Sequence, residues 1–458
     1  MSSLYAERRE RFYERLGPSA AAILPGAREI RRNGTNTYRF RQASDLLYLT
    51  GFEEPDAFAV FTPGKAQRFT IFLRPRDPMR ENWTGRRVGA DDAPTALGAD
   101  QAFELGQLDT RLGELLDGCS EVYVHSGEDR ETDELLARVL RRLRTNERNG
   151  GRAPRRILDL AAVLHEDRLI KDAEALRRMR RAAAITVEAH QAAMRAARAV
   201  PGTASQGSGG GRREFEIEAL IDFTFRRHDG FAGYDTIVGC GNSATTLHYT
   251  GGREELVGGQ ILLVDAGCEW GGFTADVTRS YPVAPADGGP ATFTPEQRRL
   301  YDLVLAAQLA GIAAAKPGAT IEEIHDACVS VATAGLVELG LLSGDPAALI
   351  AKNEHRRYYV HRTSHFLGLD VHDVGAYFPD GEPRRLLPGM VITIEPGLYI
   401  RGDAELPGDQ LAGYRGTGIR IEDDILITAD GHEVLTAGAP KQPDELLALV
   451  GTGISIAL

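Results

Sequence analysis

Residues 259–267 read GQILLVDAG and residues 389–397 read GMVITIEPG, and the two stretches share one pattern. Each is a short apolar run that ends in a carboxylate, Asp265 in the first and Glu395 in the second. Short apolar runs bounded by glycine predict buried strands. A carboxylate at the end of a buried strand is costly unless a partner neutralises its charge. The two stretches therefore predict strands that carry acids into the interior, next to a neutralising group.

The helices expected before the two strands also match in order. The first strand follows a helix over residues 172–200, with Asp172 as its N-cap, and a second helix from about Glu214. The second strand follows a helix that opens with Thr294 and another that opens with a capping box at Thr320. This repeated order predicts an internal duplication. The alternative is a coincidence, because helix-then-strand patterning is common.

Each half also supplies a second acid. Asp276 lies in the strand-like TADVTRSY, on the same face as Thr278 by two-residue alternation, and Glu422 lies inside the apolar stretch GIRIEDDILI. Four converging carboxylates would repel one another, and two divalent cations would cancel their charge. Oxygen ligands with one imidazole suit Mn²⁺, Mg²⁺, Co²⁺ or Fe²⁺. Each acid alone could instead be a helix cap, a strand-end turn or a surface charge, and we expect Asp423 and Asp424 to face solvent or cap a turn.

Three histidines, His361, His365 and His372, fall within twelve residues. One can be a metal ligand, and the others can donate to a developing oxyanion. A single histidine is more often a core or surface residue, but a cluster near the acids favours a site. Arg420 lies two residues before Glu422 and shares its face, so we expect it to orient a metal-bound carboxylate. A surface ion pair is the alternative for Arg420.

Composition excludes several other classes. The net charge of −12 gives no support to a phosphate-binding surface, and no basic-aromatic stripe suggests nucleic acid. The N-terminus lacks an apolar signal core, and no apolar run is long enough to span a membrane. The cysteines are far apart and form no CxxC pair: Cys119, Cys240, Cys268 and Cys328. We expect a cytoplasmic protein that is not bound to a membrane.

The first third of the chain predicts a small α/β domain. Strands are expected at 57–61, 69–73 and 122–125, and a helix at 131–144. The Gly-, Asn- and Arg-rich residues 146–156 are interpreted as a linker.

The motifs VDAG, ADVTR, HRTSHFLGLDVHDVG, PGMVITIEPGLYI and GIRIEDDI resemble the proline-specific aminopeptidases of the pita-bread metallopeptidase superfamily. The early segments FRQASDLLYLTGFEEPDA and WTGRRVGADDAP are similar to the N-terminal domain of aminopeptidase P, so the resemblance covers nearly the whole chain. It implies an α/β fold in three parts. A creatinase-like domain (1–165) precedes a pita-bread catalytic domain (166–440), whose pseudo-twofold duplication surrounds a curved antiparallel sheet, and a C-terminal tail (441–458) follows.

The same resemblance assigns roles to individual residues. It implies two divalent metal ions, with Mn²⁺ expected, and Asp276 and Glu422 as the acids that bridge them. The full set of implied ligands is Asp265, Asp276, His365, Glu395 and Glu422. Glu395 is also expected to move a proton, with Arg420 as a further catalytic group. The implied substrate and transition-state contacts are His248, His361, His372, Trp83 and Tyr399.

The implied activity is removal of the first residue from peptides that have proline in second position. A prolidase, which cleaves only Xaa-Pro dipeptides, is the close alternative, and a non-catalytic pita-bread binding module is the remote one. The resemblance also implies a homodimer or homotetramer. Two departures bear on specificity: Arg362 and Thr363 replace the middle of the family's usual His-Gly-Leu-Ser-His, and Ala204–Gly211 looks like an insertion.

Overall fold

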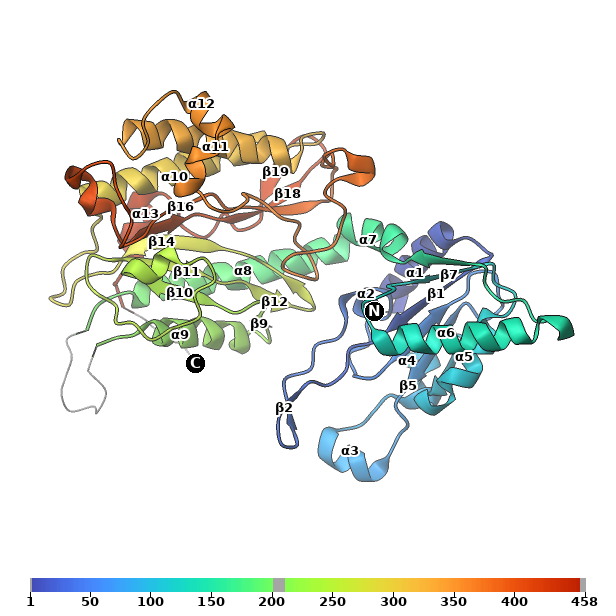
Figure 1. Cartoon of the computed structure of the whole chain (residues 1–458). Helices are drawn as coiled ribbons and strands as arrows, with labels where there is room; N and C mark the ends of the chain where they lie inside the picture. Colours follow the sequence, from blue (N-terminus) through green and yellow to red (C-terminus); the bar gives the residue numbers. More distant parts are fainter. Residues whose placement is uncertain (1, 201–210, 454–458) are drawn as a thin grey trace. The chain divides into compact units, whose positions relative to one another are not determined.

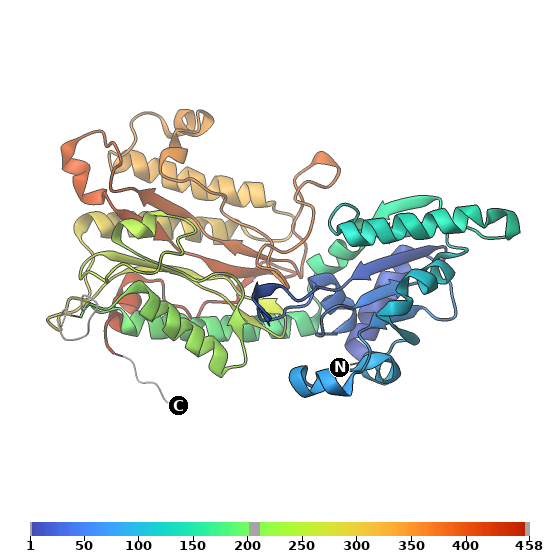
Figure 2. The ribbon, with the colours of Figure 1, turned by 60° about the horizontal axis from the view of Figure 1, so that its bottom comes forward.

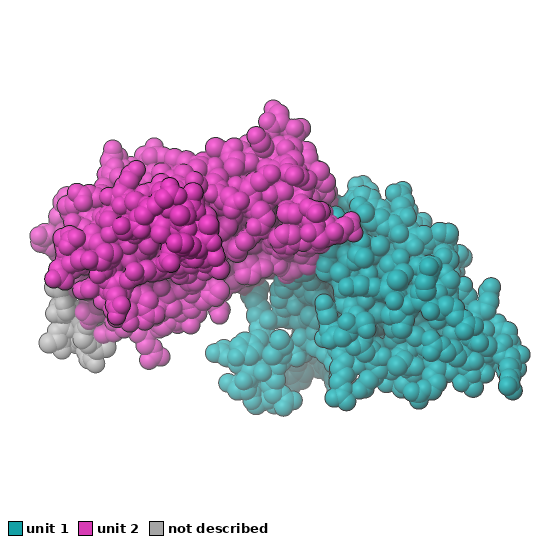
Figure 3. Space-filling view, turned by 45° about the horizontal axis from the view of Figure 1, so that its top comes forward, with its two compact units in different colours: residues 1–168 teal, residues 169–458 magenta. Residues whose placement is uncertain are grey.

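The computed structural model describes residues 2–200 and 211–453 of the 458-residue chain. It contains two compact units, Met1–Arg168 and Leu169–Leu458, which are coloured separately in Figure 3. The expected insertion at 204–211 lies outside the described residues except for Gly211. None of the described helices combines the length and the apolar character needed to cross a membrane.

The first unit is built on a six-stranded mixed sheet with the order β6-β5-β4-β1-β7-β8. The central β1 pairs antiparallel with β4 and parallel with β7. The predicted strands and helix are confirmed to within one residue at each end. The strands are β1 (Ala20–Pro25), β4 (Phe58–Phe61), β5 (Phe69–Leu73), β6 (Gln101–Glu104), β7 (Glu121–Val124) and β8 (Arg156–Asp159), with a hairpin of β2 (Arg31–Asn33) and β3 (Asn36–Thr37). The α-helices are α1 (Ser2–Leu16), α2 (Ser44–Thr50), α3 (Pro78–Thr84), α4 (Gly89–Leu97), α5 (Leu108–Leu116), α6 (Arg130–Thr145) and α7 (Ala161–Leu169).

The linker prediction at 146–156 is wrong. The stretch leads from α6 through a short 3-10 turn, Glu147–Asn149, into β8. Because β8 pairs in parallel with β7, the stretch is a loop inside the first sheet. Its glycine and polar residues reflect a tight turn, in which Gly150 has a φ of 95°.

In the second unit, strands lie between one helix pair, α8 (Ala173–Ala196) and α9 (Glu214–Arg227), and another, α10 (Pro295–Ala314) and α11 (Ile321–Glu338) (Figures 1 and 2). The predicted caps are present. The carboxylate of Asp172 accepts from the backbone of α8, and Thr294 and Thr320 each form a capping box. The first helix ends at Ala196 rather than at Val200.

The strands of the second unit all pair antiparallel and occur twice in similar order. The first half contributes β9 (Phe231–Ala232), β10 (Ile237–Cys240), β11 (Ile261–Asp265), β12 (Cys268–Trp270), β13 (Phe273–Thr274) and β14 (Thr278–Pro282). The second contributes β15 (Val391–Ile394), β16 (Gly397–Ile400), β17 (Thr417–Arg420), β18 (Asp423–Ile427) and β19 (His432–Val434). The halves meet where the Glu422 backbone donates to the Thr278 carbonyl, 3.1 Å away. This arrangement confirms the predicted fold class.

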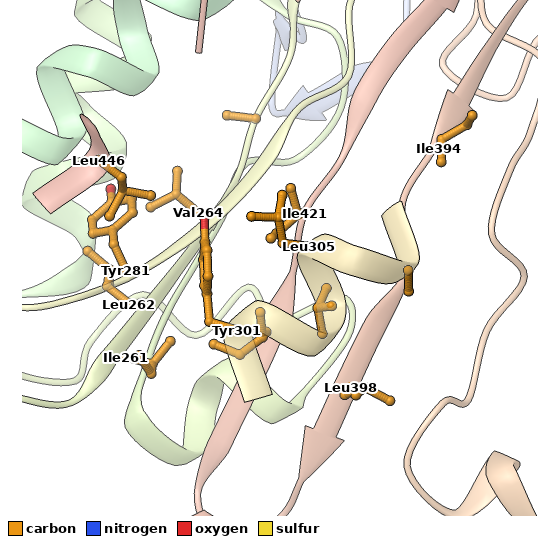
Figure 4. Close-up of a cluster of buried hydrophobic side chains, with 14 of the residues drawn as sticks. Ile261, Leu262, Val264, Tyr281, Tyr301, Leu305, Ile394, Leu398, Ile421 and Leu446 are labelled. Carbon is orange, nitrogen blue, oxygen red and sulfur yellow. The ribbon is translucent and has the colours of Figure 1, made fainter. Parts of the chain in front are cut away.

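One apolar core supports both halves of the second unit. Figure 4 shows side chains of β11, among them Val264, near Tyr301 and Leu305 of α10 and Ile421 of the second half. Leu446 of α13 (Pro443–Leu449) is fully buried in the same core, so the stretch expected as a C-terminal tail contains a packed helix. A short helix, α12 (Pro346–Ala351), follows α11.

The four acids occupy corresponding positions in the two halves: each half supplies one acid at the end of a strand and one in a break between two strands. Asp265 is the last residue of β11, and Glu395 directly follows β15. Asp276 and Glu422 were predicted inside strands, but each lies in a short break, between β13 and β14 and between β17 and β18. Their backbone N–H groups bond across the junction of the two halves rather than within a strand pair.

Candidate metal centre

Three predicted ligands converge at the junction of the two halves. A ligand atom of Asp276, one of His365 and one of Glu422 all lie within 4.8 Å of one another. His365 Nε2 is 3.3 Å from an Asp276 oxygen and 3.5 Å from a Glu395 oxygen. The other ring nitrogen, Nδ1, lies 3.0 Å from the Phe366 carbonyl and can donate to it, which leaves Nε2 to face the acids.

Asp265 joins this group through two neighbours. Arg420 Nη2 donates to Asp265 Oδ2 at 2.5 Å, as expected for a residue that orients a ligand carboxylate. Tyr234 donates to the carboxylates of both Asp265 and Asp276. Sequence reasoning missed Tyr234, because a single tyrosine in a loop has no periodicity or spacing that marks it. It also missed Thr278 as a contact: its hydroxyl donates to Glu422 at 2.6 Å and accepts from Arg420.

Crowding of the acids sets their protonation. Burial raises the pKa of Glu395 to about 7, with Asp276 adding to the rise and His365 opposing it. Burial and the charge of Asp276 raise the pKa of Glu422 well above its usual range. Burial would lower the pKa of His365, but its hydrogen bond to Asp276 and the charge of Glu395 raise that pKa to about 9. The site therefore has an excess of negative charge that favours added positive charge.

The remaining histidines surround the acids. His361 Nε2 lies 2.9 Å from the Tyr399 hydroxyl, which also accepts from Arg420, and His361 Nδ1 lies 3.7 Å from Glu395. The ring of His372 is 4.5 Å from that of His365, edge to face. Burial and the charge of Arg420 lower the pKa of His361 to about 3, and burial and His365 lower that of His372. The lowered pKa of each ring favours its neutral form.

These groups line a cavity of about 840 Å³ in the second unit. Every predicted ligand borders it, as do His248, His361, His372 and Arg420. Arg362 and Glu322 form an ion pair on its wall, so the departure at Arg362 places a cation there. The hydroxyl of Tyr399 contacts His361 and Arg420, two residues that border the cavity. Trp83 lies on α3 of the first unit and is 89% exposed.

The expectation that Asp423 and Asp424 face solvent is wrong. Both are buried: Asp423 forms ion pairs with Arg279 and Lys441, and Asp424 accepts from the backbone N–H of Asp276. Burial opposes ionisation of Asp423, but Arg279 and Lys441 outweigh it and lower its pKa to about 2. Asp423 and Asp424 therefore bind neighbouring groups of the protein rather than solvent.

The donor set fits divalent cations. Four carboxylates and one imidazole are the ligands that hard or borderline ions such as Mn²⁺ prefer, and two such ions would balance four negative charges. Burial first, and the charges of neighbouring acids second, raise the pKa values of Glu395 and Glu422, and divalent ions would offset both effects.

The chain belongs to metallopeptidase family M24, whose model matches residues 177–429. A second model, described as the aminopeptidase P N-terminal domain, matches residues 5–124. The two matches fall on the two parts that the sequence indicated.

The most similar relatives include Xaa-Pro aminopeptidases. That of Escherichia coli is 41% identical over 449 residues, 97% of each chain, and that of Haemophilus influenzae is 38% identical over 96% of this chain and 95% of the relative. Among solved structures, an aminopeptidase of Pseudomonas aeruginosa matches with a TM-score of 0.91 and 40% identity, covering 98% of both chains. An E. coli aminopeptidase P variant in complex with substrate matches with a TM-score of 0.90 and 41% identity over the same share of both chains.

Proposed function

We propose that this protein is a dinuclear-metal aminopeptidase that releases the first residue of peptides with proline in second position. The observation that carries the proposal is the similarity to the E. coli Xaa-Pro aminopeptidase along 97% of both chains, combined with a cavity bordered by all five predicted ligands. A prolidase is the close alternative.

The proposed ligands are the five residues predicted from the sequence: Asp265, Asp276, His365, Glu395 and Glu422. Asp276 and Glu422 are the proposed bridging acids. We expect two ions per chain, with Mn²⁺ as the metal, because the set is rich in carboxylates and has a single imidazole. Elemental analysis after Mn²⁺ loading tests this, and a chain that retains no metal would contradict it.

Two divalent ions held here would lower the pKa of a water molecule and make it a nucleophile near neutral pH. Glu395 borders the cavity, and its carboxylate can take a proton from the nucleophile and pass it to the leaving proline nitrogen. His361, His372 and His248 border the cavity, which supports the proposal that they hold the substrate carbonyl and the charge that develops on it. Arg420 and Tyr399 fix Asp265 and His361 in position.

A panel of peptides tests the specificity. An Xaa-Pro dipeptide, an Xaa-Pro-Yaa tripeptide and an Xaa-Ala-Yaa control are incubated with the chain, with and without Mn²⁺. We expect metal-dependent cleavage that is fastest for the proline tripeptide. Faster turnover of the dipeptide would move the assignment to prolidase, and no turnover of any peptide would favour the binding module.

We also propose a cytoplasmic homodimer or homotetramer, in which the exposed Trp83 contacts substrate. All four cysteines are free and buried, which suits a reducing compartment. Light scattering tests the assembly, and a Trp83→Ala variant tests the contact: we expect a raised KM, and an unchanged KM would rule the contact out.

A further inference from the structure

A second group of ligand-type side chains converges inside the first unit. Asp45 lies in the first turn of α2, His125 directly follows β7, and His165 lies in α7. His125 Nε2 is 2.7 Å from Asp45 Oδ2, and His165 Nε2 is 3.2 Å from the same oxygen. A ligand atom from each residue lies within 4.8 Å of the other two, so one oxygen and two ring nitrogens face a common point.

The spacing of these atoms suits a single metal ion. Zinc binds imidazole nitrogen and carboxylate oxygen at about 2.0–2.2 Å, so neighbouring ligand atoms of a tetrahedral site are about 3.3 Å apart. The 3.2 Å separation of His165 from Asp45 is close to this distance, and the 2.7 Å separation of His125 from Asp45 is a hydrogen-bond distance that would have to lengthen. The rings of His125 and His165 are 5.1 Å apart and inclined by 30°, which leaves both nitrogens on the side of Asp45. Small side-chain movements would close the three atoms around an ion.

The groups behind the three side chains match those that usually support metal ligands. Arg168 Nη1 donates to Asp45 Oδ1 at 2.7 Å, the oxygen that the histidines do not share. His125 Nδ1 lies 3.6 Å from a carboxylate oxygen of Asp159, on the far side of the ring. Such outer partners fix the orientation of ligand carboxylates and imidazoles. Arg420 holds Asp265 of the catalytic cavity in the same manner.

Charge and ligand type indicate which ion fits. The single carboxylate is offset by Arg168, so the site has little net negative charge to attract hard ions such as Mn²⁺ or Mg²⁺. Two imidazoles favour a borderline ion such as Zn²⁺. The three side chains are 13–20% exposed, which encloses the site but leaves it accessible to solvent. We propose that Asp45, His125 and His165 bind one divalent ion of the zinc class, separate from the catalytic metals.

The competing explanation is a hydrogen-bonded cluster that needs no ion. In it both histidines donate to Asp45, and Arg168 completes the charge balance. This cluster would tie α2, the end of β7 and α7 together by itself. This explanation predicts that zinc neither binds to nor stabilises the first unit. A measurement of metal binding therefore distinguishes the two explanations.

The test counts zinc on the full-length chain. Wild type and a His125→Gln/His165→Gln double variant are loaded with Mn²⁺, dialysed against Zn²⁺ and analysed for metal content. His228→Gln is the matched control, because His228 lies 2.8 Å from the Glu188 carboxylate and is 20% exposed but has no second imidazole beside it. Any exchange in the catalytic cavity affects all three proteins equally.

We expect the double variant to bind one zinc ion fewer per chain than wild type, and the control to match wild type. Equal zinc content in all three proteins would overturn the proposal. If the double variant does not fold by circular dichroism, the single His165→Gln variant replaces it. Loss of one ligand should then weaken zinc binding by about tenfold or more, since loss of an outer partner alone costs about 10–100-fold. An affinity of the His165→Gln variant for zinc that equals that of wild type would also overturn the proposal.

Discussion

The catalytic cavity and the Asp45 cluster combine the same kinds of side chain in different proportions. The proposed ligand set of the cavity brings four carboxylates to one imidazole, with Arg420 beside them, whereas the cluster brings one carboxylate to two imidazoles and one arginine. In the cavity, burial and like charges raise the pKa of Glu395 and Glu422. In the cluster, burial also opposes ionisation of Asp45, but its hydrogen bonds to His125 and His165 and the charge of Arg168 lower its pKa.

This difference in composition indicates which of the two sites depends on added cations. The cavity holds more negative charge than its own groups can neutralise, so divalent ions complete it. The cluster is already balanced, so an ion there adds stability without being required. Four predictions test the contrast, ordered here from the largest expected effect to the smallest.

The largest effect is expected for His365→Ala. This change removes the only imidazole of the proposed ligand set, so metal content should fall below the proposed two ions per chain. A metal ion contributes several kcal/mol to such a reaction, so the rate should fall by roughly 10³ or more. Metal analysis and peptide hydrolysis check this, with His228→Ala as the control. A variant that keeps both metals and full activity would remove His365 from the ligand set.

A smaller effect is expected for His361→Ala and His372→Ala. Both residues border the cavity, and neither belongs to the proposed ligand set. We expect both metals to remain and kcat to fall by about 10², the loss typical of one transition-state donor. Steady-state kinetics and metal content are measured together. The ligand assignment fails if His372→Ala strips metal while His365→Ala does not, and wild-type behaviour of all three would make the cluster structural.

A change of stability rather than activity is expected for Asp45→Asn. The amide keeps one acceptor oxygen and no charge, so either the buried guanidinium of Arg168 or the two imidazoles would face an NH2 donor, and neither would keep a charged acceptor. Hydrogen bonds to charged groups contribute about 1.5–3 kcal/mol, so the free energy of unfolding should fall by about 2 kcal/mol. Urea denaturation measures it. The Mn²⁺ content of the cavity should stay at the wild-type value, and a loss of Mn²⁺ would show that the two sites are not independent.

Sequence patterns located much of this arrangement. Asp265 and Glu395 end apolar runs, and Thr294 and Thr320 show capping sequences, because each signal is contained in a few adjacent residues. The burial of Asp423 could not be predicted in this way. Its partner Arg279 is 144 positions away, and that pairing depends on how the two halves meet.

The Asp45 cluster was not predicted for the same reason. Asp45 lies in the segment FRQASDLLYLTGFEEPDA, which resembles the family's N-terminal domain, but His125 is 80 positions away from it and His165 is 120. The resemblance to a known family implied the proposed metal ligands as a set, but it assigned no role to these three residues. Only the folding of β7, α2 and α7 around one sheet brings them together.

The smallest expected effect is a pH dependence of stability. It distinguishes a bound ion in the first unit from a hydrogen-bonded cluster without one. Burial would lower the pKa of His125, but the hydrogen bond and charge of Asp45 raise it above the usual 6.5. A raised pKa means that the charged imidazole stabilises the fold fully below about pH 6.5, and that this stabilisation is lost as pH rises through the folded-state pKa. The titratable and charged groups around His125 are Asp45, Asp159, Glu128, His165 and Arg168.

Zinc reverses this trend, because it binds neutral imidazole and competes with protons. The increase in Tm produced by Zn²⁺ should therefore be larger at pH 8 than at pH 6. A difference of about 1 kcal/mol corresponds to about 2–4 °C for a unit of this size. Thermal unfolding at both pH values, with and without Zn²⁺, measures the difference, and the His125→Gln/His165→Gln variant should lack it. A zinc effect that is absent, or that is larger at pH 6, would assign the cluster to hydrogen bonding alone.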